Sequence, residues 1–137
     1  MTDAPAPEAE PAGSLSHADL RRAYLESIQY ELSMLTDFIV QEGDENDLFI
    51  LIGDHQPARV ARYVDGWDTP IHIISRDPAL ISAFEPYGFT PGLGTGDNEA
   101  TLHHEGLYSL LVRVLLQQYG ADPSRLPEYR PTGIPFE

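Results

Sequence analysis

Apolar side chains recur at spacings of three and four along residues 17–42, and this periodicity predicts one long amphipathic helix. Ser16 and Asp19 resemble a capping box at its start, with Asp in place of Glu or Gln, and Gly43 is suited to end it. The acidic, Pro- and Ala-rich residues 1–15 offer nothing to bury, so we expect a disordered tail or linker there.

Two short apolar runs, residues 48–52 and 71–75, predict β-strands. The first run shows no alternation with polar residues, which is typical of a strand covered on both faces inside a parallel sheet. Residues 58–65, between the two runs, are expected to form a short helix or an irregular loop.

Helical patterns return in the second half of the chain. Pro78 after Asp77 suits the first helical position and predicts a helix of about two turns to Phe84. The Gly- and Pro-rich residues 85–98 predict a long loop. Residues 99–119 are expected to end as an amphipathic helix closed by a glycine, and the Pro-rich residues after it to form an extended tail packed on the body.

Alternation of helices and strands favours an α/β class, a layered α/β/α arrangement with a short, mostly parallel sheet. Two strands make a poor sheet, since a typical sheet has about four to six. Either further strands lie in residues 58–65 and 86–102, or this chain supplies part of a larger sheet.

Net charge narrows the function classes. The chain has 8 basic residues, all Arg, against 22 Asp and Glu, for a net charge of −14. Such a body repels phosphate backbones and anionic headgroups, and the scattered arginines form no basic patch, so nucleic-acid binding and lipid docking are not expected.

Composition also limits the cofactors and the compartment. Without cysteine there is no disulfide, thiolate zinc site, iron–sulfur cluster or thiol catalysis. The sequence carries no signal-peptide pattern and no run of about 20 apolar residues that would predict a membrane span. We expect a soluble chain, cytoplasmic by default.

The strongest chemical signal is Asp54-His55, placed where the first strand runs out into a turn at Gly53. In open α/β sheets ligands collect at the carboxyl ends of strands. A carboxylate and an imidazole suit zinc, manganese or a similar divalent ion, and the Gly53 turn would let both side chains converge. The alternative is an Asp that caps the turn beside a His that faces solvent.

His103-His104-Glu105 is the second candidate, because it could supply a further metal ligand or a general acid at a helix start. Surface polar residues are the simpler interpretation. His72 lies among isoleucines and is expected to be a core or half-buried residue. Asp68 and His72 have the D-x-x-x-H spacing of some metal ligands, but Thr69-Pro70 breaks any helix that would bring the two side chains together.

Three arginines follow strand ends and could bind an anionic group, although solvated surface arginine is the simpler interpretation: Arg59, Arg62 and Arg76. The glycine-rich stretch Gly92–Gly96 looks like a phosphate loop but lacks the Lys-Ser/Thr of a P-loop, so a plain loop is expected.

The segment Leu48–Pro57 (Leu-Phe-Ile-Leu-Ile-Gly-Asp-His-Gln-Pro) and its echo Thr69–Pro78 resemble the C-terminal part of alkaline phosphatase/sulfatase superfamily hydrolases. His104–Ser109 and Leu126–Tyr129 fit the same comparison, which covers about residues 17–135. The Gly-Asp-His-Gln-Pro segment is its most specific part.

The resemblance implies that residues 16–137 are the C-terminal portion of a sulfatase-like α/β domain. It implies that Asp54 and His55 ligate a divalent metal (zinc, manganese or calcium), with His104, or less readily His103, as a third ligand. The reaction it implies is metal-assisted hydrolysis of an anionic phosphate or sulfate ester.

The sequence departs from the superfamily in its missing nucleophile. In that superfamily the nucleophile, an early metal-binding Asp and a D-x-x-x-H pair all precede the Asp-His segment, whereas here a tail and one helix precede it. We therefore expect part of a metal site that needs an upstream catalytic segment, inactive alone, in an enzyme whose larger form could be extracytoplasmic. The alternative is a non-catalytic interaction module that self-associates or binds another chain through an exposed sheet edge.

Overall fold

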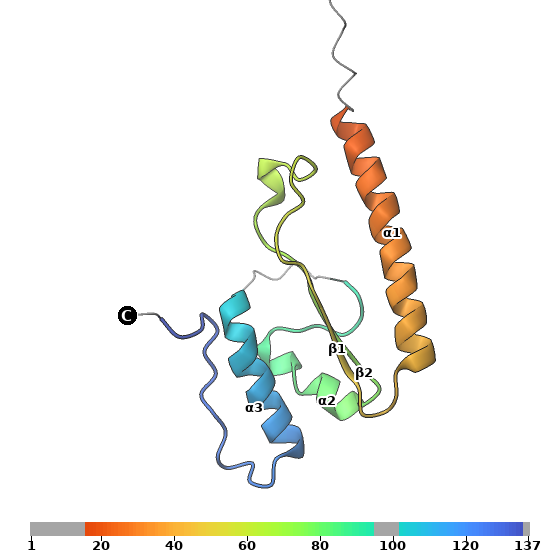
Figure 1. Cartoon of the computed structure of the whole chain (residues 1–137). Helices are drawn as coiled ribbons and strands as arrows, with labels where there is room; N and C mark the ends of the chain where they lie inside the picture. Colours follow the sequence, from red (N-terminus) through yellow and green to blue (C-terminus); the bar gives the residue numbers. More distant parts are fainter. Residues whose placement is uncertain (1–15, 95–101, 136–137) are drawn as a thin grey trace, which may run out of the picture.

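The structure is a computed structural model that describes residues 16–94 and 102–135 of the 137-residue chain (Figure 1). The tail expected at residues 1–15 lies outside these ranges, as do parts of the loop at 85–98 and of the segment at 99–119. The helices and strands are α1 (His17–Glu42), β1 (Leu48–Ile52), β2 (Ile71–Ser75), α2 (Pro78–Ser82) and α3 (Leu107–Tyr119). Short 3-10 turns occupy Tyr63–Asp65, Glu85–Tyr87 and His104–Gly106.

Local capping fixes both ends of α1, as the sequence predicts. The Ser16 hydroxyl oxygen accepts the Asp19 N–H at 3.2 Å and donates to the Asp19 carboxylate at 2.6 Å. At the other end the Gly43 N–H donates to the Ile39 carbonyl at 3.2 Å. These bonds satisfy backbone groups that a helix otherwise leaves unpaired at its ends.

The two predicted strands form, but they pair antiparallel, so the prediction of a mostly parallel sheet is wrong. A parallel pair needs a long crossover, usually a helix, to carry the chain back to the same end of the sheet. The connection between β1 and β2 holds one 3-10 turn, Tyr63–Asp65, and therefore returns the chain in the opposite direction. In the described part of the chain these two strands are the whole sheet.

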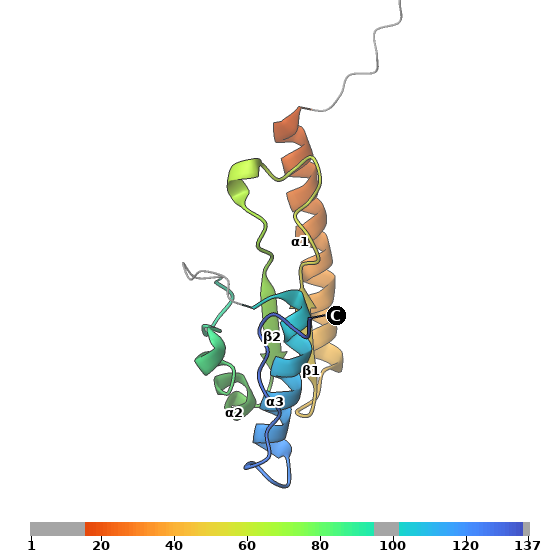
Figure 2. The ribbon, with the colours of Figure 1, turned by 90° about the vertical axis from the view of Figure 1, so that its left-hand side faces the viewer.

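Both faces of this hairpin carry apolar side chains, which explains the unbroken apolar run in β1. Because side chains alternate along a strand, Leu48, Ile50 and Ile52 share one face and Phe49 and Leu51 the other. Helices lie on both sides of the hairpin, α1 on one and α3 on the other (Figures 1 and 2).

The core lies on the α3 side of the hairpin. Its buried members are Leu80, Phe84, Leu110 and Val114, from α2, the residues after it, and α3. Leu48 and Ile73 of the hairpin pack against this cluster. The expected extended tail closes it from outside, where the Tyr129 ring packs edge-on against Tyr87 with 4.9 Å between centroids.

Polar bonds hold the tail and the 3-10 turn after α2 on α3. Arg113, in the middle of α3, donates to the Tyr87 hydroxyl at 2.9 Å and to the Pro127 carbonyl at 2.6 Å. Gly106 is buried because the tail passes so close that a Cβ there would collide with the Pro131 carbonyl. The helix predicted within 99–119 therefore starts at Leu107, after a 3-10 turn on which the tail packs.

Helix α1 touches the body along one side and buries none of its residues. Phe38 packs edge-on against Phe49 of β1, with 6.2 Å between ring centroids, and yet remains 55% exposed. Arg21 reaches across to the Val60 carbonyl at 3.3 Å, and Arg76 to the Val40 carbonyl at 3.3 Å. No helix in residues 16–94 and 102–135 combines the length and the apolar character that crossing a membrane requires.

Leu110→Ala should lower the free energy of unfolding by about 2–5 kcal/mol, because this fully buried side chain leaves a cavity among packed neighbours. The matched control is Leu116→Ala in the same helix, where the side chain is 41% exposed and the loss should be below about 1 kcal/mol. Urea unfolding followed by circular dichroism measures both. Equal losses would contradict the position of the core.

Tyr119→Phe should destabilise the protein most between about pH 4 and pH 10. The Tyr119 hydroxyl donates to Asp77 at 2.5 Å, which lowers the pKa of Asp77 and raises the pKa of Tyr119. The bond's contribution is lost in acid as pH falls through the lowered Asp77 pKa, and in base as pH rises through the raised Tyr119 pKa.

Thermal unfolding of wild type and Tyr119→Phe across pH measures this contribution. The difference in Tm should shrink on both sides of that range. The Asp77 bonds to the Ala79 and Leu80 N–H groups remain in the variant, so α2 keeps its cap. A difference that does not change with pH would contradict the pairing.

Candidate functional site

The carboxyl end of β1 is fixed at Gly53 by three hydrogen bonds. Its N–H donates to the Pro70 carbonyl at 3.0 Å, and its own carbonyl accepts the Thr69 hydroxyl at 2.7 Å. The same carbonyl lies 2.8 Å from Nε2 of His104. A Cβ on residue 53 would lie 3.0 Å from the Thr69 Cβ, so glycine permits this close approach. The strand end is thereby tied to the chain before α3.

Directly after this anchor, the side chains of Asp54 and His55 converge. The Asp54 Oδ2 lies 3.5 Å from Nε2 of His55, while Oδ1 accepts the His55 backbone N–H at 2.9 Å. Both side chains face solvent, with exposed fractions of 86% for Asp54 and 71% for His55. The pair is accessible to an ion from solution.

A third contact orients the His55 ring. Nδ1 lies 2.9 Å from the Gln56 carbonyl oxygen, and because a carbonyl can only accept, Nδ1 carries the proton. In the neutral ring Nε2 is then the nitrogen with a lone pair, and it faces the Asp54 carboxylate. Metal-bound histidines commonly donate their second N–H to a backbone carbonyl in this way.

The donor pair fits one end of a metal site. Two donors bound to one tetrahedral zinc at about 2.0–2.1 Å are separated by about 3.3–3.4 Å. The 3.5 Å between Asp54 Oδ2 and His55 Nε2 is close to that spacing. Within the ranges that the structure describes, no group of three or more His, Cys, Asp or Glu side chains is arranged to hold a metal. The chain therefore presents two adjacent donors.

The structure brings His104 to the same strand end but gives its Nε2 another bond. Because the Gly53 carbonyl can only accept, Nε2 carries the proton that it donates there, and Nδ1 is left as the ring's acceptor. The proposed role of His104 as a third ligand stays a prediction. His103, the less favoured choice, is exposed, and its backbone N–H donates to the Pro131 carbonyl at 2.9 Å.

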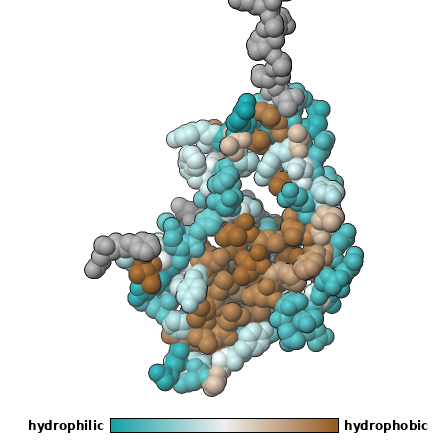
Figure 3. Space-filling view, viewed as in Figure 1, coloured by the Kyte–Doolittle hydropathy of each residue, from teal (hydrophilic) through white to brown (hydrophobic). Residues whose placement is uncertain are grey.

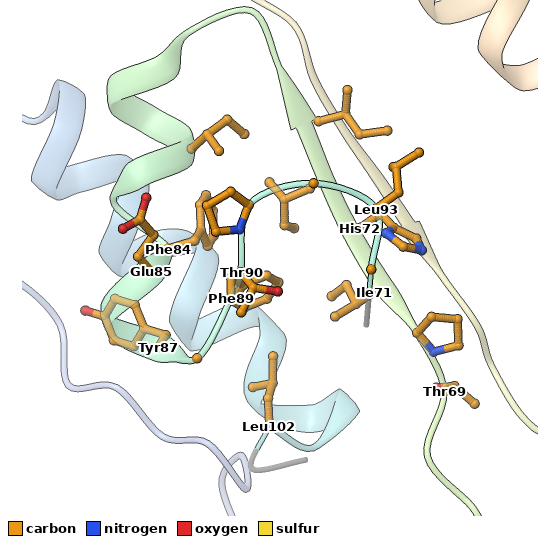
Figure 4. A pocket seen from close by; sticks show the side chains of 18 of the residues that line it. Thr69, Ile71, His72, Phe84, Glu85, Tyr87, Phe89, Thr90, Leu93 and Leu102 are labelled. Carbon is orange, nitrogen blue, oxygen red and sulfur yellow. The ribbon is translucent and has the colours of Figure 1, made fainter. Parts of the chain in front are cut away.

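Two hollows flank this region. The smaller, about 370 Å³, is lined by Trp67, Thr69, His103, His104 and Glu105 among others, and lies beside the Gly53 anchor. The larger, about 670 Å³, runs between β2, the residues after α2 and the loop at 88–94 (Figure 4). Its lining is mainly apolar, and neither Asp54 nor His55 contributes to it.

The remaining candidates do not join the Asp54–His55 pair. His72 is half-buried in β2, as expected, and lines the larger hollow. The Asp68 backbone carbonyl accepts the Gln56 side-chain amide, which ties the two ends of the connection between the strands. Of the glycine-rich stretch, Thr95 and Gly96 lie outside the described residues.

Among the three arginines, Arg76 bonds to the end of α1, and Arg59 is exposed with a positive φ of 64°. Sequence reasoning missed Gln56 and Thr69, whose polar side chains close the connection onto the strand ends. For Thr69 the available signal was Pro70, which has no N–H to donate to the Gly53 carbonyl opposite it, so that the Thr69 hydroxyl donates there instead.

Comparison with protein-family models, with curated proteins and with solved structures finds no match to this chain, so the geometry above and the motifs of the sequence carry the functional argument.

Proposed function

We propose that this chain supplies part of a divalent-metal site, as the C-terminal portion of a hydrolase that resembles the alkaline phosphatase/sulfatase superfamily. One observation carries the proposal. Asp54 and His55 point donor atoms at each other across 3.5 Å, exposed to solvent, at the carboxyl end of β1. We propose Asp54 and His55 as the metal ligands, and His104 as a third ligand that the described structure does not place together with them.

The electrostatics of the pair support a cation between the two side chains. Nδ1 of His55 bonds to the Gln56 carbonyl, and Nε2 is thereby directed at the Asp54 carboxylate, 3.5 Å away. A metal ion binds more tightly when further donors complete its coordination, so two donors predict weak binding to this chain.

The substrate class proposed is the one that the resemblance implies, and a bound divalent ion would make it compatible with the charge of this chain. An anionic phosphate or sulfate ester is repelled by a chain of net charge −14, and a divalent ion at Asp54 and His55 would offset that repulsion locally. When bound, such an ion polarises an ester oxygen and stabilises developing negative charge. Asp54 and His55 would hold and orient it.

The nucleophile is proposed to come from other polypeptide. No Ser or Thr of this sequence stands in a context that matches the superfamily's nucleophile. We accordingly expect no turnover of an aryl phosphate or aryl sulfate by this chain alone. A layered α/β/α sheet of more strands, with the β1–β2 hairpin as one part, is the fold proposed for the completed domain.

Asp54→Asn and His55→Gln should each weaken binding of Mn²⁺ and Zn²⁺ by about tenfold or more, because the first removes the negative charge of a ligand and the second replaces an imidazole nitrogen with a weaker amide oxygen, while both keep a similar side-chain size. Isothermal titration calorimetry with the metal alone measures this. His104→Gln tests the third ligand, and a comparable loss there would support it.

The matched control is His17→Gln, which removes an exposed imidazole at the start of α1 that the proposal does not assign to the site. Its metal affinity should equal that of the wild type. If Asp54→Asn also bound metal as the wild type does, the assignment of the site would be wrong.

A further inference from the structure

β1 presents an unpaired backbone edge. The bond from the Gly53 N–H to the Pro70 carbonyl sets the pattern of the ladder, because residues opposite each other in an antiparallel pair alternate between bonded and non-bonded. Phe49 and Leu51 therefore direct their N–H and C=O groups to β2. Those of Leu48, Ile50 and Ile52 point to the opposite side, where no described backbone group or side chain pairs with them.

This edge lies within a broad apolar surface. Figures 1 and 2 place β1 on the side of the hairpin that faces the viewer in Figure 1, between α1 and α3. Figure 3 shows apolar atoms gathered in the middle of that same face. Exposed apolar side chains of the flanking elements include Leu35 and Phe38 of α1, Ile52 of β1 and Leu116 of α3. A strand added here would be covered on both of its faces.

The other edge of the hairpin is not equivalent. α2 packs against β2, and the loop at 88–94 lies along the larger hollow beside it (Figure 4). In the described part of the chain, β1 therefore offers the edge that lies open between two helices. Backbone pairing with pockets for alternate side chains is the recognition mode that such an edge supports.

The charges around β1 indicate which kind of strand could bind at its open edge. Asp44, Glu45 and Asp47 precede β1, and Asp54 follows it. A second copy in the symmetric register that pairs Ile50 with itself would set Asp54 opposite Asn46, between Glu45 and Asp47 of the other copy. Like charges would then meet at both ends, between two chains of net charge −14 each.

We propose that the open edge of β1 binds an apolar β-strand of another polypeptide that carries basic residues at its ends. One end of that strand lies beside Asp54 and His55 in either direction of pairing. The idea that this strand also brings the missing metal ligands rests on the proposed function. The strand pairing itself does not depend on metal.

Hydrogen exchange of single amides tests the edge, read by NMR in EDTA so that metal binding plays no part. In the free protein, the amides of Phe49 and Leu51 should be protected and those of Ile50 and Ile52 should exchange quickly. The probe is a synthetic peptide of five alternating Val and Ile residues with two Arg at each end. This peptide should slow the amide exchange of Ile50 and Ile52 by at least about tenfold, because their N–H groups would then be bonded in a ladder to the added strand.

Two control peptides separate pairing from simple apolar contact. Replacing each Arg by Glu should weaken binding by about tenfold or more at low salt, with the difference shrinking as salt rises. N-methylation of the peptide nitrogens that face β1 should also weaken it by about tenfold or more, because the ladder bonds cannot form.

A matched pair of variants tests the same edge from the protein side. Ile50→Pro removes an N–H that points to the open edge, and Ile73→Pro removes one from the opposite edge of β2. Peptide binding should be lost in the first and kept in the second. Should either variant fail to fold, the N-methylated peptide decides the question with the wild-type protein.

Three results would overturn the proposal. Unchanged exchange at Ile50 with saturating Arg peptide would mean that the edge accepts no strand. Equal affinity for the N-methylated peptide would reduce the surface to apolar contact. Protection of Ile50 in the peptide-free protein, together with a dimer in sedimentation velocity, would make a second copy the occupant. If the metal titration shows no binding, the strand-binding proposal is unaffected. If the peptide does not bind, the metal-site proposal is likewise unaffected.

Discussion

The structure depends on the way Gly53 ends β1. Its N–H closes the ladder to β2, and its carbonyl gathers the Thr69 hydroxyl and the His104 ring. Three segments distant in sequence are thus tied to one residue: the end of β1, the return of the chain into β2, and the turn that starts α3. The convergence of Asp54 and His55 follows this anchor directly, because a strand that ended later would send successive side chains to opposite faces.

Local signals determine the elements that the sequence predicts correctly. Ser16 and Gly43 bound α1 through bonds within a few residues of themselves, and Asp77 caps α2 in the same way. Strand direction, by contrast, is decided by how the chain travels between strands. An unbroken apolar run reports that both faces are covered, which is equally true of a parallel strand and of this antiparallel one. The missing crossover helix was the signal that would have distinguished them.

The site shows the same division. The convergence of Asp54 and His55 could be expected from a glycine turn at a strand end. The state of each ring could not, because it depends on carbonyls brought close by folding: Gln56 for His55 and Gly53 for His104. Two histidines that look alike in sequence therefore differ in the nitrogen they leave free, Nε2 in the first and Nδ1 in the second.

The open edge of β1 and the exposure of the Asp54–His55 pair have one physical cause. Packing of α3 and α2 covers one face and one edge of the hairpin, while α1 covers the other face without burying any of its own residues. The side left open is the side on which β1 runs toward Asp54. A strand laid there would satisfy the outward groups of Ile50, cover the exposed side of α1, and end next to the two donors. One added strand would thus cover exposed apolar surface and pair the open backbone groups of β1, and under the proposed function it would also bring ligands beside Asp54 and His55.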